Sequence, residues 1–306
     1  MLSTSQYRYS REHRTTLVSG PIAEPVSITD FQNYLQLKGE TLDSTIVYRR
    51  IKSSRELIEN QIRRCYVQQT WNLVIDSINQ SYDPLIPESW SVVAPIDIPK
   101  PPLLYIQGVY LTSIGNVETL ADPSTYLIST DSIGRITLNY GSMWNPTRRF
   151  SGFRVQFSCG YLIPITVTDS IFTANNSGLA DGTVLRYHYT AASPIAELWP
   201  DSGFNEANFT LPLYVLNPSD NPNSFQLSLT PGGSPITIAT DVTTIGHFLT
   251  KNFPENLREA LLITATQGMR KGLPSGGTKK GESTSLCIPE QALEKLAGYT
   301  VDSIAF

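Results

Sequence analysis

The sequence predicts an α+β fold, in which a helical framework carries a small antiparallel sheet and an inserted all-β, sandwich-like domain. Three observations predict it. Amphipathic helical patterns lie at 27–65 and 254–268, and short alternating β patterns fill 69–161. The stretch from Thr166 to Lys251 differs from both flanks because it is dense in turn residues. A chain of 306 residues is long enough for two or three domains with cores of their own.

Residues 1–20 are predicted to form an N-terminal extended arm. They are polar, rich in Ser, Thr, Arg and Tyr, and show no helical apolar period. Such an arm is either disordered in isolation or ordered against a partner, and both outcomes stay open.

The first helix is predicted over 27–37. Ser27 is a suitable N-cap residue with Asp30 three residues later, and Gly39 follows the helix. Its predicted buried stripe consists of Phe31, Tyr34 and Leu35.

The second helix, predicted over 43–65, has the clearest periodicity in the chain. Apolar residues recur at steps of three and four, which predicts one buried face. These residues are Ile46, Val47, Ile51, Leu57, Ile58, Ile62 and Cys65. The other face carries the basic residues Arg49, Arg50, Lys52 and Arg55. They either face an acidic partner, a neighbouring subunit or nucleic acid, or they form a solvated face with pairs such as Arg55–Glu59.

The region 69–161 is predicted to form the small antiparallel sheet. Trp71, Leu73 and Ile75 alternate with polar residues, as strands with one buried face do. Prolines at 99, 101 and 102 indicate a rigid extended segment before a strand at 103–111. The aromatic residues of this region are interpreted as core; they are Trp90, Tyr105, Tyr110, Tyr126 and Trp144.

The inserted β domain is assigned to 166–251. Strand-like segments VLRYHYT, LPLYVLN, SFQLSLT and PITIAT alternate between turn signals such as Pro231-Gly232-Gly233. Because the helical framework resumes after it, its two ends are expected to lie close together, with the domain projecting outward.

The framework continues over 252–306. A helix is predicted at 254–268, with Pro254 and Glu255 in its first turn. A flexible Gly-rich loop covers 270–286, and its spacing fails the phosphate-binding pattern because Thr278 separates the second Gly from Lys. A short helix at 289–296 precedes an extended C-terminal tail.

Composition argues for a particle component rather than an enzyme. Charged residues make up 16% of the chain and the net charge is −4, without the basic excess of a dedicated nucleic-acid binder. His13, His188 and His247 form no catalytic motif, and carboxylates such as Asp181, Glu197 and Asp201 are unspecific. We therefore expect no catalytic residue, no cofactor and no metal site.

Cysteines and hydropathy indicate the compartment. Cys65, Cys159 and Cys287 are odd in number and lack metal-ligand spacing, so we expect reduced, mostly buried thiols. No apolar run approaches the ~20 residues that span a bilayer, and the N-terminus has no apolar signal core. The sequence therefore predicts a protein that is neither inserted in a membrane nor secreted by a signal peptide.

The order of these segments resembles a known family. PVSITDFQNYLQL from Pro25, the helix ending in IENQIRRC, FRVQFSCGY ending at Tyr161, and FPENLREALLITATQGM from Phe253 together resemble the head–tail connector (adaptor) proteins of tailed bacteriophages. The resemblance covers 25–161 and 253–306, so 21–165 and 252–306 correspond to a connector core. The insertion is similar to a β module found in other phage structural proteins.

The resemblance implies a structural virion protein in the head–tail neck, assembled in the host cytoplasm. It implies a dodecameric ring between the portal protein and a downstream neck or tail protein, through which DNA passes with transient, non-specific contact. The implied portal-binding residues are Tyr299, Val301, Ile304 and Phe306, and the implied channel-facing or neighbour-facing residues are Arg49, Arg50, Lys52 and Arg55.

One alternative function stays open at this point. The insertion could bind a receptor or glycan, as part of a spike or fibre, by stacking aromatic rings on sugars. Its candidate rings are Tyr187, Tyr189, Trp199 and Phe204.

Overall fold

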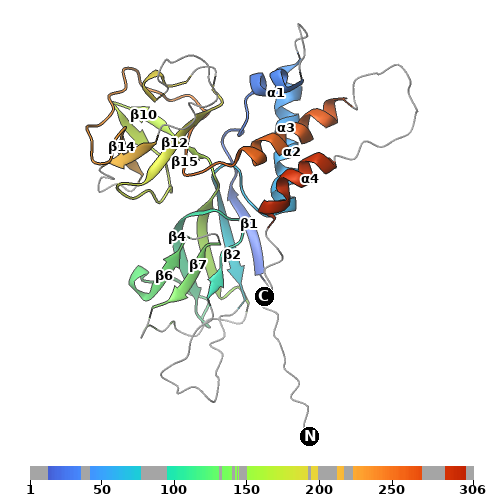
Figure 1. Cartoon of the computed structure of the whole chain (residues 1–306). Helices are drawn as coiled ribbons and strands as arrows, with labels where there is room; N and C mark the ends of the chain where they lie inside the picture. The colour runs from blue at the N-terminus through green and yellow to red at the C-terminus, as the bar shows by residue number, and fades with distance from the viewer. Residues whose placement is uncertain are drawn as a thin grey trace, which may run out of the picture. The chain divides into compact units, whose positions relative to one another are not determined.

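The computed structural model of the protein describes residues 13–35, 42–76, 95–130, 133–139, 142, 144, 150–191, 194–198, 212–216, 223–270 and 287–300. It divides into two compact units (Figure 1). The first contains the described residues of Met1–Ser19 and Thr70–Ser158, and the second those of Gly20–Gln69 and Cys159–Val301.

Two sheets make up the first unit. The larger has the order β1-β2-β8-β4-β5, with β1 (His13–Ser19), β2 (Gln69–Ile75), β8 (Phe153–Cys159), β4 (Leu103–Thr112) and β5 (Glu118–Leu120). The smaller has the order β3-β7-β6, with β3 (Ile96–Asp97), β7 (Arg135–Leu138) and β6 (Tyr126–Ser129). The strands at 69–76, 103–111 and 153–161 lie where the sequence predicts them.

Residues 13–19 of the predicted extended arm form strand β1. Residues 13–19 pair antiparallel with β2, from His13 opposite Ile75 to Ser19 opposite Thr70. The Arg14 guanidinium donates to the Ser151 hydroxyl at 2.7 Å. Nearly every side chain of β1 is exposed, which agrees with the lack of an apolar period in its sequence. Backbone hydrogen bonds to β2, rather than burial of side chains, therefore hold β1 in the sheet.

Aromatic packing in the first unit agrees only partly with the prediction. Trp144 is buried 5.3 Å from Phe153, and its indole N–H donates to the Thr125 hydroxyl at 3.2 Å. Tyr126 is also buried. Tyr105 is 38% exposed and does not belong to the core, while Trp90 lies outside the described residues.

Four α-helices occur in the described part of the second unit: α1 (Ile28–Leu35), α2 (Ser44–Ile62), α3 (Glu255–Arg270) and α4 (Glu290–Leu296). The predicted cap of α1 is confirmed, because the Asp30 amide donates to Ser27 Oγ at 2.9 Å and the Ser27 amide to Asp30 Oδ2 at 3.2 Å. Helix α2 ends at Ile62, before the predicted 65, because Arg63 adopts a left-handed conformation with φ 57°.

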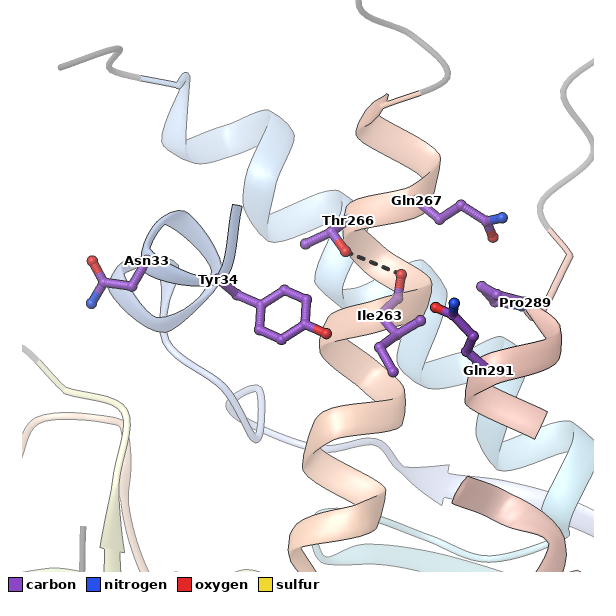
Figure 2. Close-up of a pocket in the computed structure, with 7 residues that line it drawn as sticks. All are labelled: Asn33, Tyr34, Ile263, Thr266, Gln267, Pro289 and Gln291. Atoms are coloured by element: carbon purple, nitrogen blue, oxygen red, sulfur yellow. Dashed lines mark hydrogen bonds between the residues drawn. The ribbon is translucent and has the colours of Figure 1, made fainter. Parts of the chain in front are cut away.

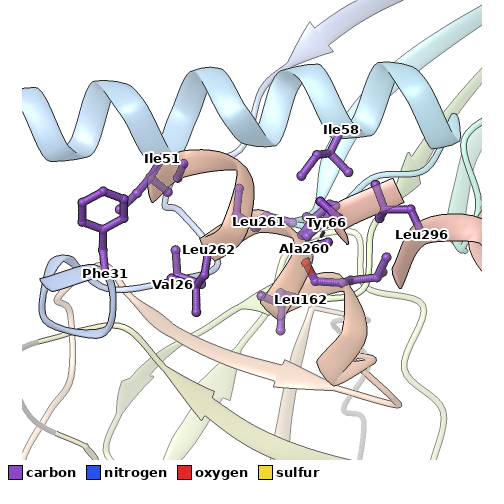
Figure 3. Close-up of a cluster of buried hydrophobic side chains, with 14 of the residues drawn as sticks. Val26, Phe31, Ile51, Ile58, Tyr66, Leu162, Ala260, Leu261, Leu262 and Leu296 are labelled. Atoms are coloured by element: carbon purple, nitrogen blue, oxygen red, sulfur yellow. Dashed lines mark hydrogen bonds between the residues drawn. The ribbon is translucent and has the colours of Figure 1, made fainter. Parts of the chain in front are cut away.

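A single hydrophobic core joins helices that are far apart in sequence. Helix α3 packs on α1, α2 and α4, and Figure 3 shows the buried side chains where they meet. Phe31, Ile58 and Leu261 are fully buried in this core, which also takes in Leu162 and Phe248. Residues before and after the insertion therefore fold as one body. Tyr34, predicted to be buried, is 37% exposed.

The insertion forms one sheet of seven strands in the order β10-β11-β14-β13-β12-β15-β9. Their bounds are β10 (Thr166–Thr168), β11 (Ile171–Thr173), β14 (Ser224–Ser228), β13 (Leu213–Leu216), β12 (Val184–Tyr189), β15 (His247–Thr250) and β9 (Ile163–Pro164). The strands follow one hydrogen-bonded order rather than the two facing sheets of a sandwich. PITIAT (235–240) is not a strand, although its Ile236 amide donates to the Leu227 carbonyl at 2.7 Å.

The two ends of the insertion are hydrogen-bonded neighbours. Strand β15 pairs antiparallel with β9, with Leu249 opposite Ile163, so the chain returns where it left. The module is also bound to the helical part. The His188 ring nitrogen Nε2 donates to the Pro25 carbonyl at 3.1 Å, and the Thr190 hydroxyl donates to the Glu24 carbonyl at 3.3 Å. The module therefore shares one compact unit with the helices.

Candidate interaction surfaces

One face of α2 is exposed. Tyr48, Arg49, Lys52 and Glu56 project within about a third of the helix circumference, because they follow at steps of one, three and four residues. We call these four residues the α2 outer face. All four are exposed, Tyr48 to 44%. An aromatic ring beside two cations and one carboxylate suits contact with another macromolecule.

Two other residues of α2 differ from the prediction. Ile46, expected in the buried stripe, is 52% exposed at the margin of the outer face. Arg50 is half-buried and already interacts within the chain.

Arg55 does not belong to any exposed face, which corrects its assignment to a channel or a neighbour. Its side chain is 2% exposed. Arg55 Nε donates to Glu24 Oε2 at 2.7 Å and Nη1 donates to Glu59 Oε2 at 2.6 Å. The pairing of Arg55 with Glu59 that the sequence allowed is therefore present, but it is buried.

Glu59 extends this cluster to the segment after α2. Its carboxylate accepts from the Tyr66 amide at 2.7 Å and from the Gln69 side-chain amide at 3.0 Å. Burial raises the pKa of the Glu24 and Glu59 carboxyls, while their donors oppose the rise. Burial lowers the pKa of the Arg55 guanidinium, but the two carboxylates outweigh it and keep Arg55 charged. We call Glu24, Arg55, Glu59 and Gln69 the buried charge cluster.

The C-terminal residues are only partly described. Tyr299 is half-buried against the helical core, and its carbonyl accepts from Arg64 Nε at 2.6 Å. Arg64 Nη1 also donates to the Tyr161 hydroxyl at 3.0 Å. Tyr299 is therefore packed on its own chain. Val301, Ile304 and Phe306 lie outside the described residues.

A pocket of about 580 Å³ opens between α1, α3 and α4. Figure 2 shows its lining, which combines amide side chains with an aromatic ring and two apolar residues. The lining residues are Asn33, Tyr34, Ile263, Thr266, Gln267, Pro289 and Gln291. The Thr266 hydroxyl donates to the carbonyls of Leu262 at 2.8 Å and Ile263 at 3.1 Å, so it serves the helix rather than the pocket. No charged residue lines it among the described side chains.

The β module does not present Tyr187 to a sugar. Tyr187 is 5% exposed, accepts from the Ile195 amide at 2.9 Å and donates to His247 Nδ1 at 2.6 Å. Burial lowers the pKa of His247, which agrees with a neutral ring that accepts through Nδ1. Tyr189 is half-buried and stacks on Tyr187. Trp199 and Phe204 lie outside the described residues.

The first unit exposes aliphatic side chains at the hairpin that joins β4 to β5, a feature that sequence reasoning missed. Ile114 is 76% exposed, and Val117 and Leu120 are each 60% exposed. The Ser113 amide donates to the Val117 carbonyl at 2.9 Å, which closes the turn. The signal was available in the sequence SIGNV, where two aliphatic residues flank a Gly-Asn turn.

The described residues contain no cluster of three or more His, Cys, Asp or Glu side chains that could bind a metal ion. None of their helices is long and apolar enough to cross a membrane.

Comparison with known proteins gives structural neighbours only. No protein-family model and no curated protein matches the chain. The fold is similar to a chain from the neck of an empty gene transfer agent (GTA) particle with C6 symmetry, with a TM-score of 0.47 and 11% identity, over 96% of this chain and 98% of that one.

Two further GTA structures cover less of the fold. A chain of the native particle's virion matches with a TM-score of 0.38 and 14% identity, over 48% of this chain and 71% of that one. A chain from the native neck with C12 symmetry matches with a TM-score of 0.35 and 15% identity, over 48% and 70%. Identities and TM-scores this low carry no inference about activity or partners.

Proposed function

We propose that this protein is a structural virion component, a head–tail connector that forms a dodecameric ring between the portal and the tail. The observation that carries the proposal is the single helical core. Residues 23–67 and 248–296 pack as one body although the strands of the first unit and the β module separate them in sequence. This is the framework, interrupted by an insertion, on which the sequence resemblance to connector proteins depends.

The α2 outer face is proposed as the ring contact. A ring needs a heterologous interface, in which two different surfaces of the same chain meet. Tyr48 supplies apolar area, and Arg49 and Lys52 supply charge that orients the neighbour. The chain has 27 acidic and 23 basic side chains, so the proposal requires that these cations meet carboxylates of another copy.

The remaining partners follow from the same proposal. The tail beyond Thr300 would dock on the portal, and the aliphatic hairpin at Ile114 and Val117 would contact the downstream neck or tail protein. DNA would pass through the ring with transient, non-specific contact. The work is mechanical, and no catalytic step is involved. Assembly would take place in the host cytoplasm.

Native mass spectrometry of the purified chain, alone and with its portal protein, tests this function. We expect a closed oligomer whose mass corresponds to twelve copies, and electron microscopy should show it as a ring beneath the portal. A chain that stays monomeric with its portal present, or that is found on a distal fibre of the particle, would contradict the proposal.

A pair of matched variants tests the α2 outer face. Lys52→Glu should abolish or strongly reduce ring formation, whereas Lys251→Glu makes the same charge change at an exposed site of the same unit and should leave it unchanged. Equal assembly by both variants would remove the α2 outer face from the ring contact.

A further inference from the structure

Two buried cysteines lie in contact although 94 positions separate them. Cys65 follows α2 and is 1% exposed, and Cys159 ends β8 and is 0% exposed. Their sulfur atoms are 3.1 Å apart. Neither cysteine forms a disulfide in this structure, and a disulfide requires sulfur atoms about 2.05 Å apart. A shift on the order of 1 Å would therefore join them.

The backbone around the two cysteines is fixed in register. The Gln68 amide donates to the Leu162 carbonyl at 2.9 Å, and the amides of Tyr161 and Leu162 both donate to the Tyr66 carbonyl, at 3.0 and 2.9 Å. Val67 and Leu162 form a parallel bridge. Because these bonds directly follow both cysteines, the backbone holds the two residues beside each other.

The residue after Cys159 brings the two segments close. Gly160 has φ +139°, and a Cβ at this position would lie 2.6 Å from the Gln68 nitrogen and the Val67 carbonyl carbon. Only glycine allows this approach. The third cysteine, Cys287, is exposed and is not part of the pair.

We propose that Cys65 and Cys159 form an intramolecular disulfide when the folded protein meets an oxidant, and so act as a redox-dependent staple. Because both thiols are buried, a small oxidant such as hydrogen peroxide suits the pair. One thiolate attacks a peroxide oxygen, which forms a sulfenic acid and releases hydroxide; the second thiolate attacks the sulfenic sulfur and releases a second hydroxide. The two thiol protons convert both hydroxides to water, so two thiols lose two protons and two electrons.

The staple would close a loop that contains every strand from β2 to β8. Cross-linking residues this far apart restricts the unfolded chain and thereby stabilises the folded one. Thiols stay reduced in the cytosol and are oxidised outside it. A protein that is made in the cytosol and acts outside it would form this disulfide on leaving the cytosol. The chemistry does not depend on the proposed ring, so the two ideas can fail separately.

The experiment uses the full chain with Cys287→Ser, so that the buried pair supplies the only thiols. The protein is reduced, freed of reductant, and incubated under native conditions with oxidised glutathione or hydrogen peroxide. We expect loss of both free thiols, a cross-linked peptide that contains Cys65 and Cys159, and a mass lower by two hydrogen atoms. The melting temperature should rise by roughly 5–10 °C, and added reductant should reverse the change.

The matched control adds Cys65→Ser to the same background, which should show no cross-link and no oxidant-dependent rise. If this variant does not fold, Cys159→Ala replaces it. Three results would overturn the proposal: thiols that stay free in native protein but cross-link in denaturant, stable glutathione adducts without a cross-link, or a cross-link that leaves the melting temperature unchanged.

Discussion

Replacing Arg55 with methionine tests the buried charge cluster. The substitution keeps most of the side-chain volume but removes both donors of Glu24 and one donor of Glu59. Glu59 keeps the Tyr66 and Gln69 donors, whereas Glu24 keeps no other side-chain donor within the described part of the chain. Removing one partner of a buried ion pair typically costs 3–5 kcal/mol. We expect a loss of about 4 kcal/mol in the free energy of unfolding at pH 7.

Urea unfolding followed by circular dichroism measures this loss. Glu56→Gln is the matched control: Glu56 is 54% exposed and 3.8 Å from Arg55, so its removal should cost less than about 0.5 kcal/mol. The triple variant Arg55→Met, Glu24→Gln and Glu59→Gln should recover most of the stability, because no charge is then buried without a partner.

The pH dependence gives the result that would refute this reasoning. Because burial raises the pKa of Glu24 and Glu59, the folded state binds protons more tightly than the unfolded state. These carboxyls therefore favour the folded state at low pH, and that contribution is lost as pH rises through their folded pKa. The penalty of Arg55→Met should accordingly shrink from pH 7 to pH 5. A cost below about 1 kcal/mol at pH 7, or one independent of pH, would show that no unpaired buried charge is created.

Three further variants test the core, the backbone and a buried histidine. Leu261→Ala should lower the unfolding free energy by about 2–5 kcal/mol, because Leu261 is buried. Leu293→Ala, at a position that is 41% exposed, should lower it by less than about 1 kcal/mol. Equal losses would contradict the packing described for α3. Gly160→Ala should lower the unfolding free energy by at least about 2 kcal/mol. Gly182→Ala should lower it by about 1 kcal/mol, because φ is +74° there but no atom lies within 4 Å of the added Cβ. Thermal unfolding of both variants measures the difference. Burial lowers the pKa of His188, so the unfolding free energy of the wild-type protein should fall as pH falls below about 6.5. His188→Gln should lose less stability over the same pH range in urea titrations. An equal dependence of unfolding free energy on pH in both proteins would refute a neutral His188.

Sequence periodicity located the helices because their burial follows a regular step. Val47, Ile51 and Ile58 are buried as the three- and four-residue steps predict. Ile46 and Arg55 break the rule in opposite directions. An exposed isoleucine and a buried arginine depend on which residues lie opposite, and Glu24, which is 31 positions from Arg55, cannot be placed by periodicity.

Strands were harder to predict because the chain supplies their partners from a distance. PITIAT (235–240) alternates like a strand but does not form one in the structure, while His13–Ser19 has no apolar alternation and pairs with β2. The contact between Cys65 and Cys159 also depends on segments that are distant in sequence. It arises only when the segment after α2 lies beside the end of β8.

The segment around Glu24 and Pro25 has a mechanical consequence. The Glu24 side chain is bound to Arg55 of α2, while its carbonyl accepts from Thr190 and the next carbonyl accepts from His188, both in the β module. A force that pulls on the module therefore reaches α2 through Glu24 and Pro25, in addition to Phe248, which packs in the shared core. A domain tethered by a single flexible linker would reorient under such a load, whereas this module keeps its orientation until these hydrogen bonds and core contacts break.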